Sequence, residues 1–230
     1  MGTRPTLSSA VAAIERQGAL LVYPIDNRPA PPSLWSAFHP RTPMRWEWDA
    51  DGDDRVSELW HLREELSRSG RVVYAKWFRG RATFFARDIF VGLLAALESG
   101  RGRPVLSGEA TRLLQALEQD SPLSTKQLKA TTDLRGAALS AVYERAMKEL
   151  WARGLIVGYG EVDEGAFPSL AVGATRLLFE DLWDEACGMG TEAGRDRLHA
   201  RLPKDSLFLR AALKPLGGRP SRCPRPTPGA

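Results

Sequence analysis

The sequence has few of the residues that hold metal ions or build disulfide frameworks. It contains only two cysteines and three histidines in 230 residues. Cys187 and Cys223 lie far apart, and His39, His61 and His199 are scattered along the chain. This spacing indicates neither a disulfide framework, nor a zinc site, nor a catalytic triad. We therefore expect no bound metal and no cofactor.

The sequence also lacks a hydrophobic run long enough to cross a membrane. Its longest useful apolar stretch, IFVGLLAAL at residues 89–97, falls well short of the roughly 20 residues that a membrane helix needs. We expect this stretch to form a buried helix. The first residues, MGTRPTLSSAVAAIERQG, have no sustained apolar core, so no secretory signal is predicted. We expect a cytoplasmic protein without a membrane partner.

Basic residues outnumber acidic residues only slightly. The chain has 32 basic and 28 acidic residues and a sequence pI of about 9.3. Most of the excess lies near the C-terminus, where residues 215–230 contain arginine and proline but no acidic residue. Such a composition cannot bury enough apolar surface to fold, so this segment is predicted to be a disordered basic tail.

The first 100 residues predict an α+β half. Residues 71–87, RVVYAKWFRGRATFFAR, contain two β-rich runs around Arg79 and Gly80, which is typical of a hairpin. Basic residues interleave with aromatic ones here, as in surfaces that bind single strands or a flipped base. The alternation with period two favours instead a core hairpin, with buried aromatic residues and arginines at the turn.

The stretch 47–58, EWDADGDDRVSE, resembles a calcium-binding loop in the spacing of its acidic residues and its glycine. Asp54 occupies the position where such a loop normally has an aliphatic residue, and no entering helix or partner loop is predicted. Acidic residues here have a simpler role in the first turn of the following helix, where the helix dipole favours negative charge. We therefore favour a helix start over a cation site.

The second half predicts a winged helix-turn-helix over residues 105–182, in a mainly α protein with small β elements. Three helical segments, at 109–120, 123–133 and 137–154, are followed by two strand-like runs. This is the element order of a winged helix. A linker is predicted at residues 101–104, and a further helical segment at 183–214.

The third helical segment carries the recognition surface in this interpretation. The residues expected to face the other helices are Leu139, Val142, Ala146 and Leu150. The opposite face offers Ser140, Glu144, Arg145, Lys148 and Glu149. In a DNA-binding module that face would enter the major groove. The alternative is a protein-interaction module, because Glu144, Glu149 and the acidic wing tip at Asp163 and Glu164 oppose phosphate.

Four motifs carry a resemblance to a known family. They are MRWEWD, VVYAKWFRGRATFFARDIF, LSTKQLKATTDL and ERAMKELWARGLIV, beginning at residues 44, 72, 123 and 144. Together they resemble the AlkZ-related proteins, small relatives of the AlkZ winged-helix DNA glycosylases, over roughly residues 15–185. The resemblance implies a DNA-associated protein with a link to the removal of alkylated or crosslinked bases.

The glycosylase motif itself is missing. The resemblance implies that an active relative would carry Gln-x-Gln or Gln-x-Asp, whose side chains position water and stabilise charge at the sugar. The residues two positions after Gln17, Gln115, Gln119 and Gln127 are Ala19, Leu117, Ser121 and Lys129. No catalytic residue is therefore assigned.

The sequence thus favours a non-enzymatic protein that binds double-stranded DNA in a repair-linked or regulatory role. Ser140, Arg145 and Lys148 are expected to read or grip the duplex. Arg79 and Arg81 are expected to hold backbone phosphates, and Lys76 belongs to the same predicted DNA-binding set. The alternatives are a DNA glycosylase with a non-standard site and a protein-interaction scaffold. The sequence leaves the oligomeric state open.

Overall fold

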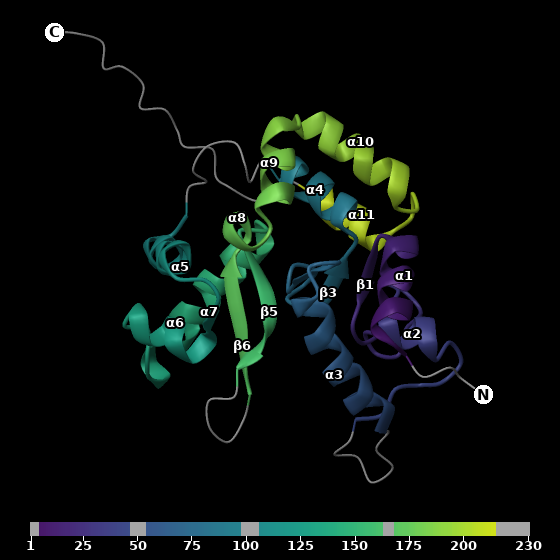
Figure 1. Cartoon of the computed structure of the whole chain (residues 1–230), viewed down its shortest axis with the longest axis horizontal. Coiled ribbons are helices and arrows are strands. Elements are labelled where there is room, and N and C mark those ends of the chain that lie inside the picture. Colours follow the sequence, from purple (N-terminus) through teal and green to yellow (C-terminus); the bar gives the residue numbers. More distant parts are fainter. Residues whose placement is uncertain (1–4, 47–53, 98–105, 163–167, 215–230) are drawn as a thin grey trace, which may run out of the picture.

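The computed structural model describes residues 5–46, 54–97, 106–162 and 168–214, and within them the chain is α+β, as expected (Figure 1). The helices are α1 Leu7–Gln17, α2 Leu34–Phe38, α3 Asp54–Arg68, α4 Arg87–Ala96, α5 Gly108–Gln119, α6 Thr125–Thr131, α7 Ala137–Ala152, α8 Thr175–Leu178, α9 Glu180–Gly188, α10 Thr191–Arg201 and α11 Leu207–Ala212. The strands are β1 Ala19–Leu21, β2 Val73–Ala75, β3 Thr83–Phe85, β4 Leu123–Ser124, β5 Ile156–Val162 and β6 Ser169–Ala174.

Several predicted features lie outside the described residues. They are the first seven positions of the acidic loop, the linker at 101–104, the wing tip with Asp163 and Glu164, and the tail at 215–230. Asp54 is within the described part of the chain and begins α3, where it supplies an acidic residue to the first turn. This placement agrees with the helix-start interpretation of that residue.

One antiparallel sheet runs through both halves of the chain. Its strand order is β1-β3-β2-β5-β6-β4. β2 and β3 form the predicted hairpin, with Val73 opposite Phe85, and β2 also pairs with β5 through Tyr74 and Gly158. The segment predicted as an N-terminal half and the segment predicted as a winged helix therefore share a continuous sheet.

The helices lie in three groups around this sheet (Figure 1). α1, α2 and α3 lie on one side, α5, α6 and α7 lie on the other, and α9, α10 and α11 gather around α4 at one end. α4 is almost entirely buried, which confirms the prediction for the apolar run at residues 89–97. A Cβ on Gly194 of α10 would lie 2.9 Å from the carbonyl oxygen of Gly92, so small residues permit this close helix approach.

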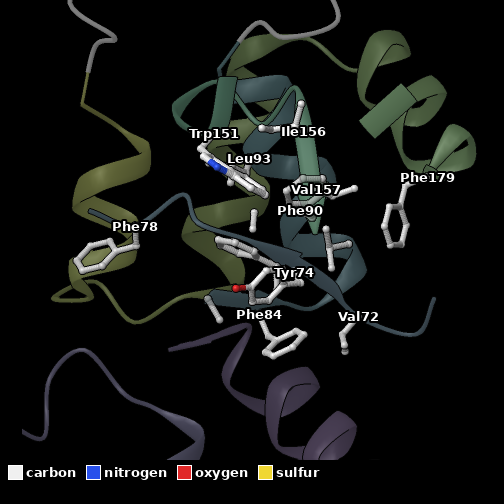
Figure 2. Close-up of a cluster of buried hydrophobic side chains, with 14 of the residues drawn as sticks. Val72, Tyr74, Phe78, Phe84, Phe90, Leu93, Trp151, Ile156, Val157 and Phe179 are labelled. Carbon is white, nitrogen blue, oxygen red and sulfur yellow. The ribbon is translucent and has the colours of Figure 1, made fainter. Parts of the chain in front are cut away.

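The hairpin aromatic residues belong to the core. Tyr74, Phe78, Phe84 and Phe85 are at most 3 % exposed. Figure 2 shows Tyr74 near residues of α4 and β5, while Phe78 lies apart from them and its ring contacts that of Phe208 in α11. Trp77 is partly buried against the same core. The structure thus confirms the core-hairpin interpretation, and the four buried rings are not available for stacking on bases.

The inward face of α7 differs from the predicted one. Its buried residues are Tyr143, Ala146, Met147, Leu150 and Trp151. Leu139 is 36 % exposed, so the prediction for this position was wrong, whereas Val142 is half-buried and packs against the core. α7 packs both on α5 and against β5, and contact with a sheet as well as a helix rotates the buried stripe toward the aromatic residues.

The pairing of β2 with β5 requires a glycine at position 158. A Cβ there would overlap the Cδ1 and Cε1 atoms of the fully buried Tyr74 ring. We expect Gly158→Ala to lower the free energy of unfolding by about 1–3 kcal/mol through overpacking. Gly108→Ala is the matched control, because no atom lies within 4 Å of the added methyl group. Urea unfolding of both variants tests this, and equal stabilities would contradict it.

Candidate nucleic-acid interface

A cleft of about 400 Å³ lies between the β2–β3 connection and α7. It is lined by Lys76, Gly80, Thr125, Tyr143, Glu144, Met147, Lys148, Trp151 and Leu170. The two walls come from opposite halves of the sequence, and the sheet pairing of β2 with β5 brings them together. The hydroxyl groups of Thr125 and Ser169 lie 2.7 Å apart, which ties the start of α6 to β6 at the edge of the cleft.

The α7 wall of the cleft is built from one row of side chains. Tyr143, Met147 and Trp151 recur every four residues and therefore lie above one another on the helix. All three are at most 6 % exposed, so they form an apolar floor. The sequence prediction missed this row, although the aromatic and sulfur-containing side chains at i, i+4 and i+8 were a usable signal.

The structure places three of the six predicted DNA-binding residues around the hairpin turn. Lys76 lines the cleft directly. Arg79 and Arg81 flank Gly80, and both are exposed. Arg79 and Gly80 have φ angles of +52° and +71°, and the Arg81 N–H donates to the Phe78 carbonyl. A turn of this kind holds the two arginines at the tip of the connection.

The other three predicted residues lie on α7. Lys148 lines the cleft and is exposed, whereas Arg145 is exposed but does not line it. Ser140 is half-buried and its hydroxyl group lies 3.4 Å from a carboxylate oxygen of Glu144. Glu149 is engaged elsewhere, since the Ser107 hydroxyl donates to it at 2.8 Å. The structure therefore gathers Lys76, Arg79, Arg81 and Lys148 around one cleft and leaves Arg145 beside it.

These basic side chains are not neutralised by acidic neighbours. Lys76, Arg79, Arg81, Arg145 and Lys148 form no ion pair among the residues that the structure describes. Arginines elsewhere are paired, among them Arg63, Arg87, Arg176, Arg195, Arg197 and Arg201. The guanidinium group of Arg79 lies 5.2 Å from the centroid of the Phe78 ring, which holds it without removing its charge.

A buried ion pair joins α3 to β5. Arg63 of α3 pairs with Glu161 of β5, and their side chains are only 8 % and 9 % exposed. Burial acts to lower the pKa of Arg63, but its interactions with Tyr74 and Glu161 outweigh burial and raise the pKa overall. Arg63 also lies 3.9 Å from the centroid of the Trp60 ring. Sequence reasoning missed this pair because its partners lie 98 positions apart.

The amine of Lys76 has an unusual environment for a lysine. Burial lowers its pKa, and the positive charge of Arg63 lowers it further, while Glu161 offsets part of this effect. The neutral form is therefore more accessible than for a lysine in water. A lysine with a lowered pKa in a cleft can act as a nucleophile or a proton acceptor.

Tyr143 contributes a buried hydroxyl group that has no hydrogen-bond partner among the described residues. Because an unsatisfied buried hydroxyl is costly, we expect Tyr143→Phe to be as stable as the wild type or up to about 1 kcal/mol more stable. Burial raises the pKa of Tyr143, so above about pH 10 the unfolded state loses a proton that the folded state keeps.

Stability should therefore fall as the pH rises above about 10, by about 1.4 kcal/mol per pH unit for this group. Tyr74 has a pKa raised by burial as well, so Tyr143→Phe should reduce the alkaline loss without abolishing it. Urea unfolding at pH 8 and pH 11 measures both effects. A Tyr143→Phe protein with the same alkaline loss as the wild type would contradict this assignment.

A second hollow of about 570 Å³ lies between α3, the end of β5 and Pro168. Trp60, His61, Glu64, Arg68 and Glu161 contribute to its lining, and Trp60 is 42 % exposed. Its acidic groups are already paired, Glu161 with Arg63 and Glu64 with Arg68. This hollow is accordingly less suited to a cationic ligand than its composition alone suggests.

The described residues contain neither a metal-binding cluster nor a membrane-spanning helix. Among the described residues there is no group of three or more His, Cys, Asp or Glu side chains that could hold a metal ion. No helix in the described ranges has both the length and the apolar character needed to cross a membrane. The molecule is thus an α+β protein with an unpaired basic rim around a small cleft.

The family assignment agrees with the resemblance found in the sequence. The family model described as AlkZ related matches residues 5–204, which include the whole sheet and both walls of the cleft. The chain belongs to this AlkZ-related family. Membership suggests a DNA-repair-linked role and an association with DNA. The search of curated proteins and the search of solved structures each returned no match.

Proposed function

We propose that this protein binds double-stranded DNA in a repair-linked setting, through the rim of the cleft between the β2–β3 connection and α7. The observation that carries the proposal is the set of five basic side chains without an acidic partner in the described residues, namely Lys76, Arg79, Arg81, Arg145 and Lys148. Phosphate contacts supply most of the affinity that is independent of sequence, and they require cations that are free to pair.

The arrangement of the second half supports a winged-helix form of this interaction. α5, β4, α6, α7, β5 and β6 follow one another in the order of a winged helix-turn-helix, and β4 pairs with β6. In such a module the helix corresponding to α7 enters the major groove. Ser140, Arg145 and Lys148 then face the duplex, and the arginines of the hairpin turn extend the contact to a neighbouring stretch of backbone.

Glu144 limits where phosphate can lie. It is exposed on α7 and lines the cleft between the two basic walls. Its charge repels phosphate from the cleft interior, so the backbone contacts are assigned to the rim residues Arg79, Arg81 and Lys148. The interior is left for an uncharged group.

Fluorescence anisotropy with a labelled duplex, repeated from 50 to 200 mM salt, tests the proposal. A protein that neutralises about six phosphates should lose roughly a thousandfold in affinity over this range. Tighter binding to a duplex with an alkylated base or an abasic site would support the repair-linked setting. Absence of binding at 50 mM salt would overturn the proposal and favour a protein-interaction scaffold.

A further inference from the structure

We infer that Lys76 forms a Schiff base with the aldehyde of an abasic deoxyribose in DNA, and that the protein cleaves the strand there as a β-lyase. The inference rests on the proposed function, because the rim must first hold the duplex. DNA binding alone requires no covalent step, whereas here the amine of Lys76 reacts with the sugar. The reaction differs from base release, so the missing glutamine motif does not bear on it.

The position of Lys76 carries the inference. It lines a cleft of about 400 Å³ together with Glu144, Lys148 and the apolar floor of α7. That volume lies at the small end of the range for ligand sites, so it suits one unit of a strand and not a duplex. A sugar without its base is such a unit, and it is uncharged apart from its flanking phosphates. Arg79, Arg81 and Lys148 surround the opening and can hold those phosphates.

Electrostatics favour the neutral, nucleophilic form of Lys76. Only the neutral amine attacks a carbonyl, and burial together with the charge of Arg63 lowers the pKa of Lys76 and enlarges its neutral fraction. Its side chain is half-buried and forms no ion pair in the described part of the chain. Lys148 and Lys204, by contrast, are exposed to solvent. Lys76 therefore combines a position in the cleft with a lowered pKa, as attack on a carbonyl requires.

The reaction balances without an oxidant or a reductant. The Lys76 nitrogen attacks C1′ of the ring-opened sugar, and the resulting carbinolamine loses water to give an iminium ion. A base removes a proton from C2′, a C2′=C3′ double bond forms, and the C3′–O bond breaks, so the 3′ phosphate leaves. Water then hydrolyses the iminium ion, which releases an unsaturated aldehyde and restores the lysine.

Glu144 is placed to accept the C2′ proton. It lines the same cleft from the opposite wall, and it is exposed. A carboxylate beside an iminium ion also stabilises the positive charge that develops during the reaction. Glu144→Gln should therefore still form the Schiff base but cleave the strand at least tenfold more slowly.

Borohydride trapping tests the inference directly. A duplex with one abasic site and a 5′ fluorescent label is incubated with the full chain, with and without sodium borohydride, and resolved on a denaturing gel. We expect a covalent protein–DNA band with borohydride and a shortened strand without it. Digestion of the trapped wild-type protein with trypsin should place the adduct in the peptide of residues 72–79, which contains Lys76 as its only lysine.

Two variants complete the test. Lys76→Arg keeps the positive charge but removes the amine, and it should reduce trapping and cleavage at least 100-fold. Lys204→Arg is the matched control and should leave both unchanged. Anisotropy on the same abasic duplex confirms that each variant is folded and binds. Trapping that survives in Lys76→Arg, or an adduct on another peptide, overturns the inference.

The binding measurement also separates the inference from the proposed function. If the wild-type protein binds the abasic duplex but no covalent band forms, the lyase inference fails and DNA binding stands. If the protein does not bind any duplex, the proposed function fails and the lyase inference fails with it.

Discussion

Replacing Arg79, Arg81 and Lys148 together with alanine is expected to weaken duplex binding roughly 100-fold at 0.1 M salt. These side chains are exposed around the cleft, and no ion pair within the described residues competes for them. Each phosphate contact adds about one unit to the slope of log K against log salt, so the triple variant should lose nearly three units of slope. Anisotropy across a salt series measures both quantities.

The matched control removes the same charge from the other side of the molecule. Arg16, Arg28 and Lys204 are exposed, and they belong to α1, to the connection before α2 and to the connection before α11. Figure 1 shows α1 and α2 across the sheet from α7. The control triple variant has the same net charge as the rim variant but should keep nearly all of the salt slope. Equal losses in both variants would mean that binding follows net charge and not this surface.

Replacing Arg63 with methionine should lower the free energy of unfolding by about 3–5 kcal/mol, because Glu161 would remain buried without a partner. The pair joins α3 to β5 and is nearly sealed from solvent. Arg63→Met also loses the stacking contact with Trp60. Urea unfolding, with a slope that stays close to the wild-type value, measures the loss.

Two further variants test whether the loss of stability comes from the unpaired buried charge of Glu161. Arg63→Met combined with Glu161→Leu should regain a large part of the lost stability, because it removes both buried charges. Arg195→Met breaks a pair in which Glu192 is 80 % exposed, and it should cost at most about 1 kcal/mol. If Arg63→Met were no more costly than Arg195→Met, the buried pair would contribute little to stability.

Local sequence signals were enough for most of the secondary structure. The turn at Arg79 and Gly80 was predicted from residue type, and it has the positive φ angles that such a turn requires. Ser124 lies at the start of the helical segment predicted at 123–133, and its hydroxyl accepts a hydrogen bond from the Gln127 N–H at the beginning of α6. These features depend on neighbours within a few residues, so a local pattern contains the information needed to predict them.

The buried face of α7 could not be predicted in the same way. Apolar spacing selected Leu139, which is exposed, and it missed Tyr143 and Trp151, which are buried on a helix that packs against both α5 and β5. A helix that contacts two elements has a wider buried face than one apolar stripe indicates. The sequence alone does not show whether the face with Leu139 or the face with Tyr143 and Trp151 packs against the sheet.

Residue types and local patterns were sufficient to predict the α+β class and the buried hairpin, and they carried the family resemblance. Only the folded chain brings Lys76 and Lys148, from opposite halves of the sequence, to one cleft. The pairing of Tyr74 with Gly158 places Lys76 beside α7, and the packing of α3 on β5 buries Arg63 with Glu161 near that lysine. Both arrangements join residues far apart in the chain. Local periodicity reports which face of a segment is buried, but not which distant segment covers it.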